Sequence, residues 1–192
     1  MPAEAGDLDG PDDRARLVSS RRLLHATLLL VVAIPAAMWL LRPAPEAEDA
    51  VSGQEVGEPA PDFTVELFDG AVFTLSTHRA ESGMPVVLNF WASWCVPCRV
   101  EMPAIDAVAV SRPDILFLGI AVQDSETAAR DFADEVGVAY PLGSDTDGTI
   151  LEDYPILGLP ATWFITSDGM IAEQWFGQLD ETMLEDLIDR HS

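Results

Sequence analysis

The sequence predicts an α/β domain in which helices cover both faces of a central mixed sheet. Two apolar runs, at residues 86–92 and 115–122, have the composition of strands that are buried on both faces. Each run is followed by a segment whose apolar residues recur at helical spacing. Near the C-terminus, two further runs flank Asp168-Gly169, a typical hairpin turn. The predicted order is strand, helix, strand, helix, two strands and a final helix.

The N-terminal part of the chain contains a long apolar run at residues 23–41. As a helix this run would be about 28 Å long, close to a bilayer core of about 30 Å, so we predict one transmembrane helix that anchors the protein. The alternative is a cleaved signal peptide, which normally has a shorter apolar region and a small-residue cleavage pattern. Residues 1–22 are rich in Asp, Pro, Gly and Arg and are predicted to be a disordered tail.

Arginines flank the apolar run unequally, with four before it and one directly after it. They are Arg14, Arg16, Arg21, Arg22 and Arg42. Because cationic residues favour the cytoplasmic side, we predict a single-pass protein of a bacterial cell membrane with its N-terminus in the cytoplasm. Residues 42–55 are then an extended linker, and residues 56–192 an extracytoplasmic domain.

Charge divides at the same boundary. Residues 1–42 hold five arginines and five acidic residues, so the other 28 acidic residues and five arginines carry the whole net charge of −23. Nucleic-acid binding requires a basic face. The composition therefore excludes nucleic acid as a partner.

The domain is expected to begin with a small N-terminal hairpin. Phe63, Val65 and Leu67 alternate with polar residues, Asp69-Gly70 turns the chain, and residues 72–75 return. The central strand follows at residues 86–92.

The helix predicted over residues 95–110 should kink at Pro103, because proline lacks an N–H donor. After the strand at 115–122, an amphipathic helix over residues 125–136 should end at Gly137. A short strand and a helical turn are expected within residues 141–154.

The last elements are a hairpin and a helix. The hairpin strands are predicted at residues 161–166 and 170–176. Asp180 can cap the final helix. The residues of this helix expected to face the sheet are Met183, Leu184, Leu187 and Ile188.

The only two cysteines, Cys95 and Cys98, lie where the central strand passes into a helix. Unpaired N–H groups and the dipole at a helix start favour negative charge, so a thiolate there is stabilised. In CxxC motifs the thiol pKa falls from about 8.5 to as low as about 3.5 to 7. We predict that Cys95 is the nucleophile and that Cys98 attacks the mixed disulfide to release the product.

Two other interpretations of the cysteines are weaker. A zinc site needs four ligands, but only one cysteine pair is present and the three histidines are scattered. A purely structural disulfide would close too short a loop to remove much entropy from the unfolded chain. We therefore expect a redox role, with no metal and no bound cofactor.

Residues 94–103, with the sequence WCVPCRVEMP, resemble the active site of membrane-anchored thioredoxin-like oxidoreductases of the TlpA/ResA/CcmG (DsbE) type. The segments GEPAPDF at 57–63 and GLPAT at 158–162 extend the resemblance, which covers about residues 56–192. The resemblance implies a thioredoxin-like fold with a central insertion at residues 121–154.

The same resemblance implies a second element of the site at Pro160. The matching proline of thioredoxin-like proteins is cis and lies against the CxxC motif, which would let the backbone of Leu159 bind an extended substrate. An ordinary turn proline is the alternative. Trp94 and Pro97 beside the cysteines complete the predicted substrate-binding residues, although packing is the default role of an aromatic residue.

Glu101 lies one helical turn beyond Cys98. The resemblance implies an acidic residue at this place near the thiols, where it could transfer a proton or raise the cysteine pKa values by like-charge repulsion. An ordinary solvated glutamate is the alternative. Asn89 stands where cytosolic thioredoxin has a buried aspartate, and asparagine cannot titrate.

These observations predict a membrane-tethered thiol–disulfide oxidoreductase that reduces disulfides in exported proteins. The resemblance implies apocytochrome c or a copper-site assembly factor as substrate, hence a role in cytochrome c-type biogenesis, and a membrane electron-donating thiol transporter as partner. One alternative is a Cu(I)-binding module of the same fold. The other is a peroxiredoxin-like peroxidase, although Cys95 lacks the preceding Pro and Thr expected of such an enzyme.

Overall fold

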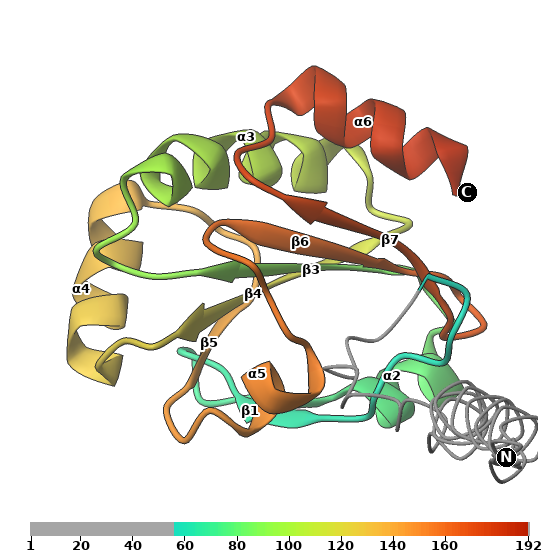
Figure 1. Ribbon diagram of the computed structural model, residues 1–192, viewed down its shortest axis with the longest axis horizontal. Helices are drawn as coiled ribbons and strands as arrows, with labels where there is room; N and C mark the ends of the chain where they lie inside the picture. The colour runs from blue at the N-terminus through green and yellow to red at the C-terminus, as the bar shows by residue number, and fades with distance from the viewer. Residues whose placement is uncertain (1–55, 192) are drawn as a thin grey trace, which may run out of the picture. The chain divides into compact units, whose positions relative to one another are not determined.

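The computed structural model describes residues 56–191 (Figure 1). The predicted tail at 1–22, anchor at 23–41 and linker at 42–55 lie outside the described residues. Within residues 56–191, no helix is long and apolar enough to cross a membrane.

A five-stranded mixed sheet forms the centre of the described domain, in the order β5-β4-β3-β6-β7. Its strands are β3 (Val86–Trp91), β4 (Leu116–Val122), β5 (Leu142–Asp145), β6 (Ala161–Ile165) and β7 (Ile171–Phe176). Strands β3, β4 and β5 are parallel, whereas β6 and β7 run antiparallel to their neighbours. Every residue of β3 is buried, as the apolar run at 86–92 predicted.

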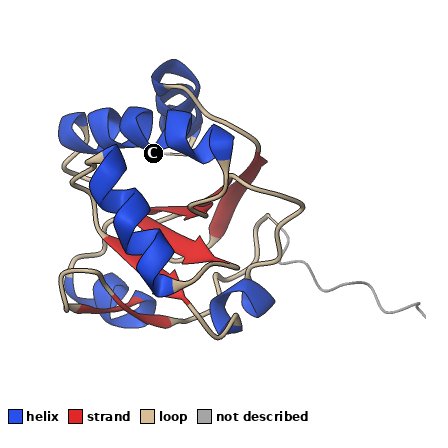
Figure 2. Cartoon of the chain, turned by 90° about the vertical axis from the view of Figure 1, so that its left-hand side faces the viewer, coloured by secondary structure: helices blue, strands red, loops and turns tan. Residues whose placement is uncertain are grey.

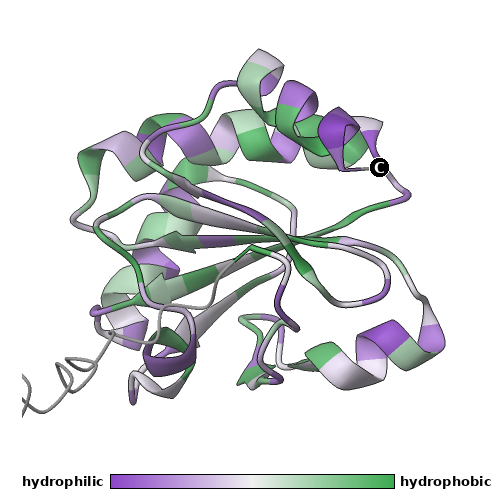
Figure 3. Cartoon of the chain, turned by 45° about the vertical axis from the view of Figure 1, so that its right-hand side comes forward, coloured by the Kyte–Doolittle hydropathy of each residue, from purple (hydrophilic) through white to green (hydrophobic). Residues whose placement is uncertain are grey.

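Helices cover both faces of this sheet, which confirms the predicted α/β class (Figure 2). One face packs against α3 (Val96–Ser111), α4 (Glu126–Val136) and α6 (Glu181–Arg190). The other face packs against the N-terminal segment and α5 (Thr149–Asp153). Figure 3 shows hydrophobic and hydrophilic segments alternating along the helices, as expected where one side of a helix is buried.

Local capping fixes the long helices where the sequence places them. The side chains of Ser125 and Asp180 accept hydrogen bonds from the backbone at the starts of α4 and α6. Gly137 ends α4 with a φ of 72°, a conformation that glycine adopts without strain. Helix α3 contains Pro103 and continues to Ser111.

The expected N-terminal hairpin is present but shorter than predicted. It consists of β1 (Thr64–Glu66) and β2 (Val72–Thr74), and Leu75 begins a helix, α2 (Leu75–Glu81), that the sequence analysis did not predict. Asp62 accepts hydrogen bonds from the backbone and the hydroxyl group of Ser76 at 2.8 and 2.7 Å, so the first turn of α2 is satisfied by a distant residue.

The chain enters the domain at the end of the sheet that lies opposite the cysteines. Gly57 donates a backbone hydrogen bond of 2.7 Å to Ile171, and Ile171 donates one of 2.8 Å to Glu58. Ile171 is the first residue of β7, which runs from this end toward the end where β3 passes into the cysteine pair. The described domain therefore has an entry end and a redox end.

Glycine at position 143 allows the N-terminal hairpin to approach β5 closely. Leu67 forms a β-bridge with Gly143, and the backbone N–H of Phe68 donates to Leu142 at 2.7 Å. A Cβ added at Gly143 would lie 2.9 Å from both the backbone oxygen of Glu66 and a methyl group of Val65. The hairpin could not keep this position against a larger residue.

We predict that Gly143→Ala lowers the free energy of unfolding by about 1–3 kcal/mol, the usual cost of overpacking. Urea unfolding of wild type and variant measures this difference. Gly158→Ala is the matched control, since a Cβ there meets nothing within 4 Å. Equal stability of the two variants would show that the hairpin does not depend on this contact.

Candidate active site

The two cysteines meet at the start of α3. Cys95 is the N-cap residue, and its sulfur accepts a hydrogen bond from the backbone N–H of Cys98 at 3.2 Å. Cys95 and Cys98 form a disulfide bond. Pro97 occupies the first turn, where a missing N–H removes no helical hydrogen bond. Cys95 is 4% exposed and Cys98 is fully buried, so Cys95 is the more accessible sulfur.

Glu101 is fully buried one turn after Cys98. Its carboxyl oxygens accept hydrogen bonds of 3.0 Å from the Asn89 side chain and from the backbone N–H of Leu179. Asn89 also donates to Thr162 at 3.1 Å. This burial rules out the interpretation of Glu101 as an ordinary solvated glutamate.

Desolvation by burial raises the pKa of Glu101 from its ordinary value of 4.5 to about 7, although the hydrogen bonds from Leu179 and Asn89 act in the opposite direction. The group therefore changes its protonation state close to neutral pH. Such a carboxyl group can hold or release a proton beside a dithiol.

Pro160 lies at the redox end of the sheet, and the Leu159–Pro160 peptide bond is cis. Ala161, the next residue, pairs with Phe90 near the end of β3, and the Pro160 carbonyl accepts a hydrogen bond from Gly177 at 2.9 Å. Pro160 is buried and Leu159 is half-buried. The sheet thus places the cysteine segment and the cis-proline segment, both of which the resemblance assigned to the site, at the same end of the domain.

Several large apolar side chains are exposed at the redox end. They are Trp94 at 58%, Val96 at 75%, Leu157 at 88% and Phe176 at 38%. Trp94 and Val96 flank Cys95, Leu157 precedes the cis proline, and Phe176 ends β7. An apolar rim of this kind suits contact with another polypeptide.

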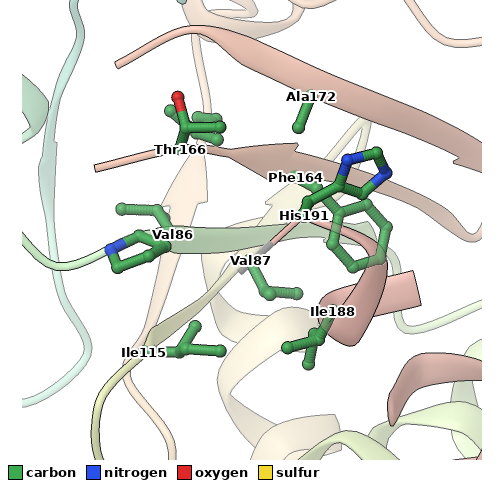
Figure 4. A pocket seen from close by; sticks show the side chains of 10 residues that line it. Val86, Val87, Ile115, Phe164, Thr166, Ala172, Ile188 and His191 are labelled. Atoms are coloured by element: carbon green, nitrogen blue, oxygen red, sulfur yellow. The ribbon is translucent and has the colours of Figure 1, made fainter. Parts of the chain in front are cut away.

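A small cavity of about 20 Å³ lies at the other end of the sheet (Figure 4). Its lining includes Val86, which begins β3, and His191, which follows α6. The volume is enough for about one water molecule. Its place at the start of β3 separates it from the disulfide, which follows the other end of that strand.

The loop before Cys95 makes contacts that the sequence analysis missed. The backbone N–H of Ser93 donates to the Asp124 carboxylate at 2.6 Å, and the indole N–H of Trp94 donates to the Gln123 carbonyl at 3.2 Å.

In the described part of the chain, no group of three or more His, Cys, Asp or Glu side chains is placed to hold a metal ion.

Comparison with known proteins shows the family to which the chain belongs. Residues 56–174 match the AhpC/TSA family. The chain belongs to that family. It is 31% identical over 169 residues to the thioredoxin-like protein YneN of Bacillus subtilis, a match that covers 85% of this chain and 95% of YneN.

Two further relatives carry a redox activity in their names. The thiol–disulfide oxidoreductase ResA of B. subtilis is 31% identical over 172 residues, covering 88% of this chain and 93% of ResA. The thiol:disulfide interchange protein DsbE of Escherichia coli K12 is 30% identical over 172 residues, covering 88% and 92%. The family member described here is accordingly a protein thiol–disulfide oxidoreductase.

Solved structures agree with the thioredoxin-like fold. A secreted Mycobacterium tuberculosis disulfide oxidoreductase homologous to E. coli DsbE superimposes with a TM-score of 0.59 and 27% identity, covering 67% of this chain and 95% of that structure. The M. tuberculosis protein DsbF gives a TM-score of 0.62 and 28% identity, covering 68% and 95%.

We predict that Glu101 makes the wild type lose stability as pH rises from about 4.5 to about 7, relative to Glu101→Gln. In this window the folded protein still binds a proton that the unfolded chain releases, so deprotonation favours unfolding. A shift from 4.5 to about 7 corresponds to about 3 kcal/mol.

Urea unfolding at several pH values measures this difference between the two proteins. Glu185→Gln removes an exposed carboxyl group of α6 and serves as control. A difference between wild type and Glu101→Gln that is independent of pH would contradict the raised pKa.

Proposed function

We propose that this oxidoreductase is tethered to the cell membrane and reduces disulfides in exported proteins. The observation that carries the proposal is the buried Glu101 carboxyl group one helical turn from Cys98. It bears on the direction of electron flow, which a CxxC motif alone does not fix.

The reaction is a two-step thiol–disulfide exchange. In the reduced protein, the Cys95 thiolate attacks one sulfur of the substrate disulfide and releases the other as a thiolate, which leaves a mixed disulfide. Cys98 then attacks the Cys95 sulfur, releases the second substrate thiolate and forms the Cys95–Cys98 disulfide found here. Two electrons pass to the substrate, whose two thiolates take up protons.

Glu101 favours this direction through its charge. Cys98 must lose a proton before it attacks, and a buried carboxylate with a pKa of about 7 is a suitable acceptor at neutral pH. The same carboxylate opposes a thiolate close to it, so the reduced state gains less stabilisation than in an oxidant such as DsbA. A less stable dithiol is a stronger reductant.

The apolar rim supports a polypeptide substrate. Trp94 and Val96 are exposed on either side of Cys95 in the chain, and exposed Leu157 and the cis-proline segment lie at the same end of the sheet. We propose apocytochrome c or a copper-site assembly factor as the substrate, and a membrane thiol transporter as the donor that reduces the disulfide again. These identities rest on the resemblance of the WCVPC motif to its family.

The proposed tether consists of residues 23–41, followed by the linker at 42–55. A fully extended linker of this length would reach about 50 Å. Gly57 is hydrogen-bonded at the entry end of the domain, opposite Cys95.

We predict that Cys95→Ser abolishes reduction of a protein disulfide, whereas Cys98→Ser accumulates a mixed disulfide on Cys95. The first variant lacks the attacking thiol, and the second lacks the thiol that releases the product. Mass spectrometry with insulin as substrate detects the trapped adduct in either variant. An adduct that accumulates on Cys98 of Cys95→Ser, with none on Cys95 of Cys98→Ser, would reverse the assignment. Stoichiometric Cu(I) binding without reductase activity would favour a copper-binding module.

We also predict that the full chain stays in the membrane fraction and that an impermeant thiol reagent labels its reduced cysteines from outside intact cells. Both results follow from the apolar run at 23–41 and the arginines that precede it. The Cys95→Ser/Cys98→Ser variant controls for labelling of other proteins. A soluble mature form that begins after residue 42 would contradict the tether without affecting the redox chemistry.

A further inference from the structure

The turn between β4 and α4 holds the loop that carries Cys95. Strands β3 and β4 are parallel neighbours in which Trp91 pairs with Ala121, so the residues that follow each strand meet at the same edge of the sheet. Ser93 follows β3 by two residues, and Gln123 and Asp124 directly follow β4. This arrangement brings two segments about 30 residues apart into contact.

The Asp124 carboxylate joins the two segments. One oxygen accepts the backbone N–H of Ser93 at 2.6 Å, and the other accepts the backbone N–H of Ser125 at 2.8 Å. Hydrogen bonds to an ionised carboxylate are about twice as strong as bonds between neutral groups. The loop is thus fixed two residues before Cys95.

The backbone of Gln123 holds the side chain of Trp94, the residue after Ser93. Its carbonyl accepts the indole N–H of Trp94 at 3.2 Å, although the Trp94 side chain is 58% exposed. Among the described residues, Gln123 is the only one other than glycine with a positive φ, at 53°. Non-glycine residues adopt this conformation rarely, and such strain clusters at functional sites.

We propose that the Gln123–Asp124 turn is a positioning element that sets the Trp94 indole beside Cys95 before a polypeptide substrate arrives. A surface that is already ordered avoids the entropy cost of ordering it during binding. The turn should therefore lower KM for protein disulfides and leave the intrinsic reactivity of Cys95 unchanged. The proposal rests on Cys95 being the attacking thiol, as in the proposed function.

The test compares a protein substrate with a small one, using the reduced full chain. Asp124→Ala should raise KM for insulin about tenfold, the loss expected for one hydrogen bond to a charged group. Its rate with the small disulfide 5,5′-dithiobis(2-nitrobenzoate) should equal that of wild type, because this reagent does not need the indole surface. Asp124→Asn should restore most of the insulin KM, since its amide oxygen can still accept from Ser93.

Asp106→Ala is the matched control. The Asp106 carboxylate also accepts two backbone N–H groups, from Ala139 and Tyr140 at 2.7 and 3.2 Å. Those residues precede β5, and they therefore lie at the sheet end opposite Cys95. Asp106→Ala should leave KM for insulin unchanged, and unfolding midpoints of both alanine variants verify that they are folded.

Trp94→Phe tests the indole directly, because it keeps an aromatic ring and removes the N–H donor. It should raise KM for insulin, and the double variant with Asp124→Ala should be no worse than the poorer single variant. Fully additive effects would show that the two residues act separately and would overturn the proposal.

Two further outcomes would also overturn it. One is a wild-type KM for insulin in Asp124→Ala, and the other is an equal loss with both substrates. Failure of the proposed function gives a different result, because wild type itself would then reduce insulin no faster than Cys95→Ser.

Discussion

Burial of the Glu101 carboxyl group is the constraint on which the redox site depends. Its hydrogen bonds to Asn89 and to the backbone of Leu179 join α3 to the central strand and to the segment before α6. Desolvation raises its pKa to about 7, so this core contains a group that exchanges a proton at neutral pH. Because the group lies one turn from Cys98, the carboxyl group and the two thiols interact when they titrate. Their apparent pKa values therefore belong to the three groups together and not to any single residue.

The sheet explains how the rest of the site assembles. Parallel β3 and β4 both end at the redox end of the sheet, and antiparallel β6 begins there. Cys95 follows β3, Asp124 follows β4 and Pro160 precedes β6, so one sheet edge gathers residues from three distant segments. The chain enters near Ile171 at the other end of the sheet. Its N-terminal hairpin then reaches the redox end, where the Phe68 ring contacts Trp91 with the ring centroids 6.4 Å apart.

Apolar spacing was enough to predict the strands of the sheet and the long helices, because burial on one or both faces leaves a direct pattern in the sequence. The CxxC motif identified the cysteine pair directly. Helix α2 was not predicted because a backbone N–H of its first turn donates to Asp62, which lies 14 residues before Ser76. The position of Glu101 followed from helical spacing, but its raised pKa depends on burial and distant hydrogen bonds. Asp124 was missed because its contact with Ser93 requires knowing which strands are neighbours.

The central claim is that the Glu101 carboxylate destabilises a thiolate close to it, which makes the reduced dithiol less stable and the protein a reductant. The reduction potential of the Cys95–Cys98 pair at pH 7, measured against glutathione redox buffers, tests this claim most directly. The account predicts a value more negative than about −200 mV, in the range of glutaredoxins and thioredoxin. A value close to about −120 mV, as in DsbA, would contradict it.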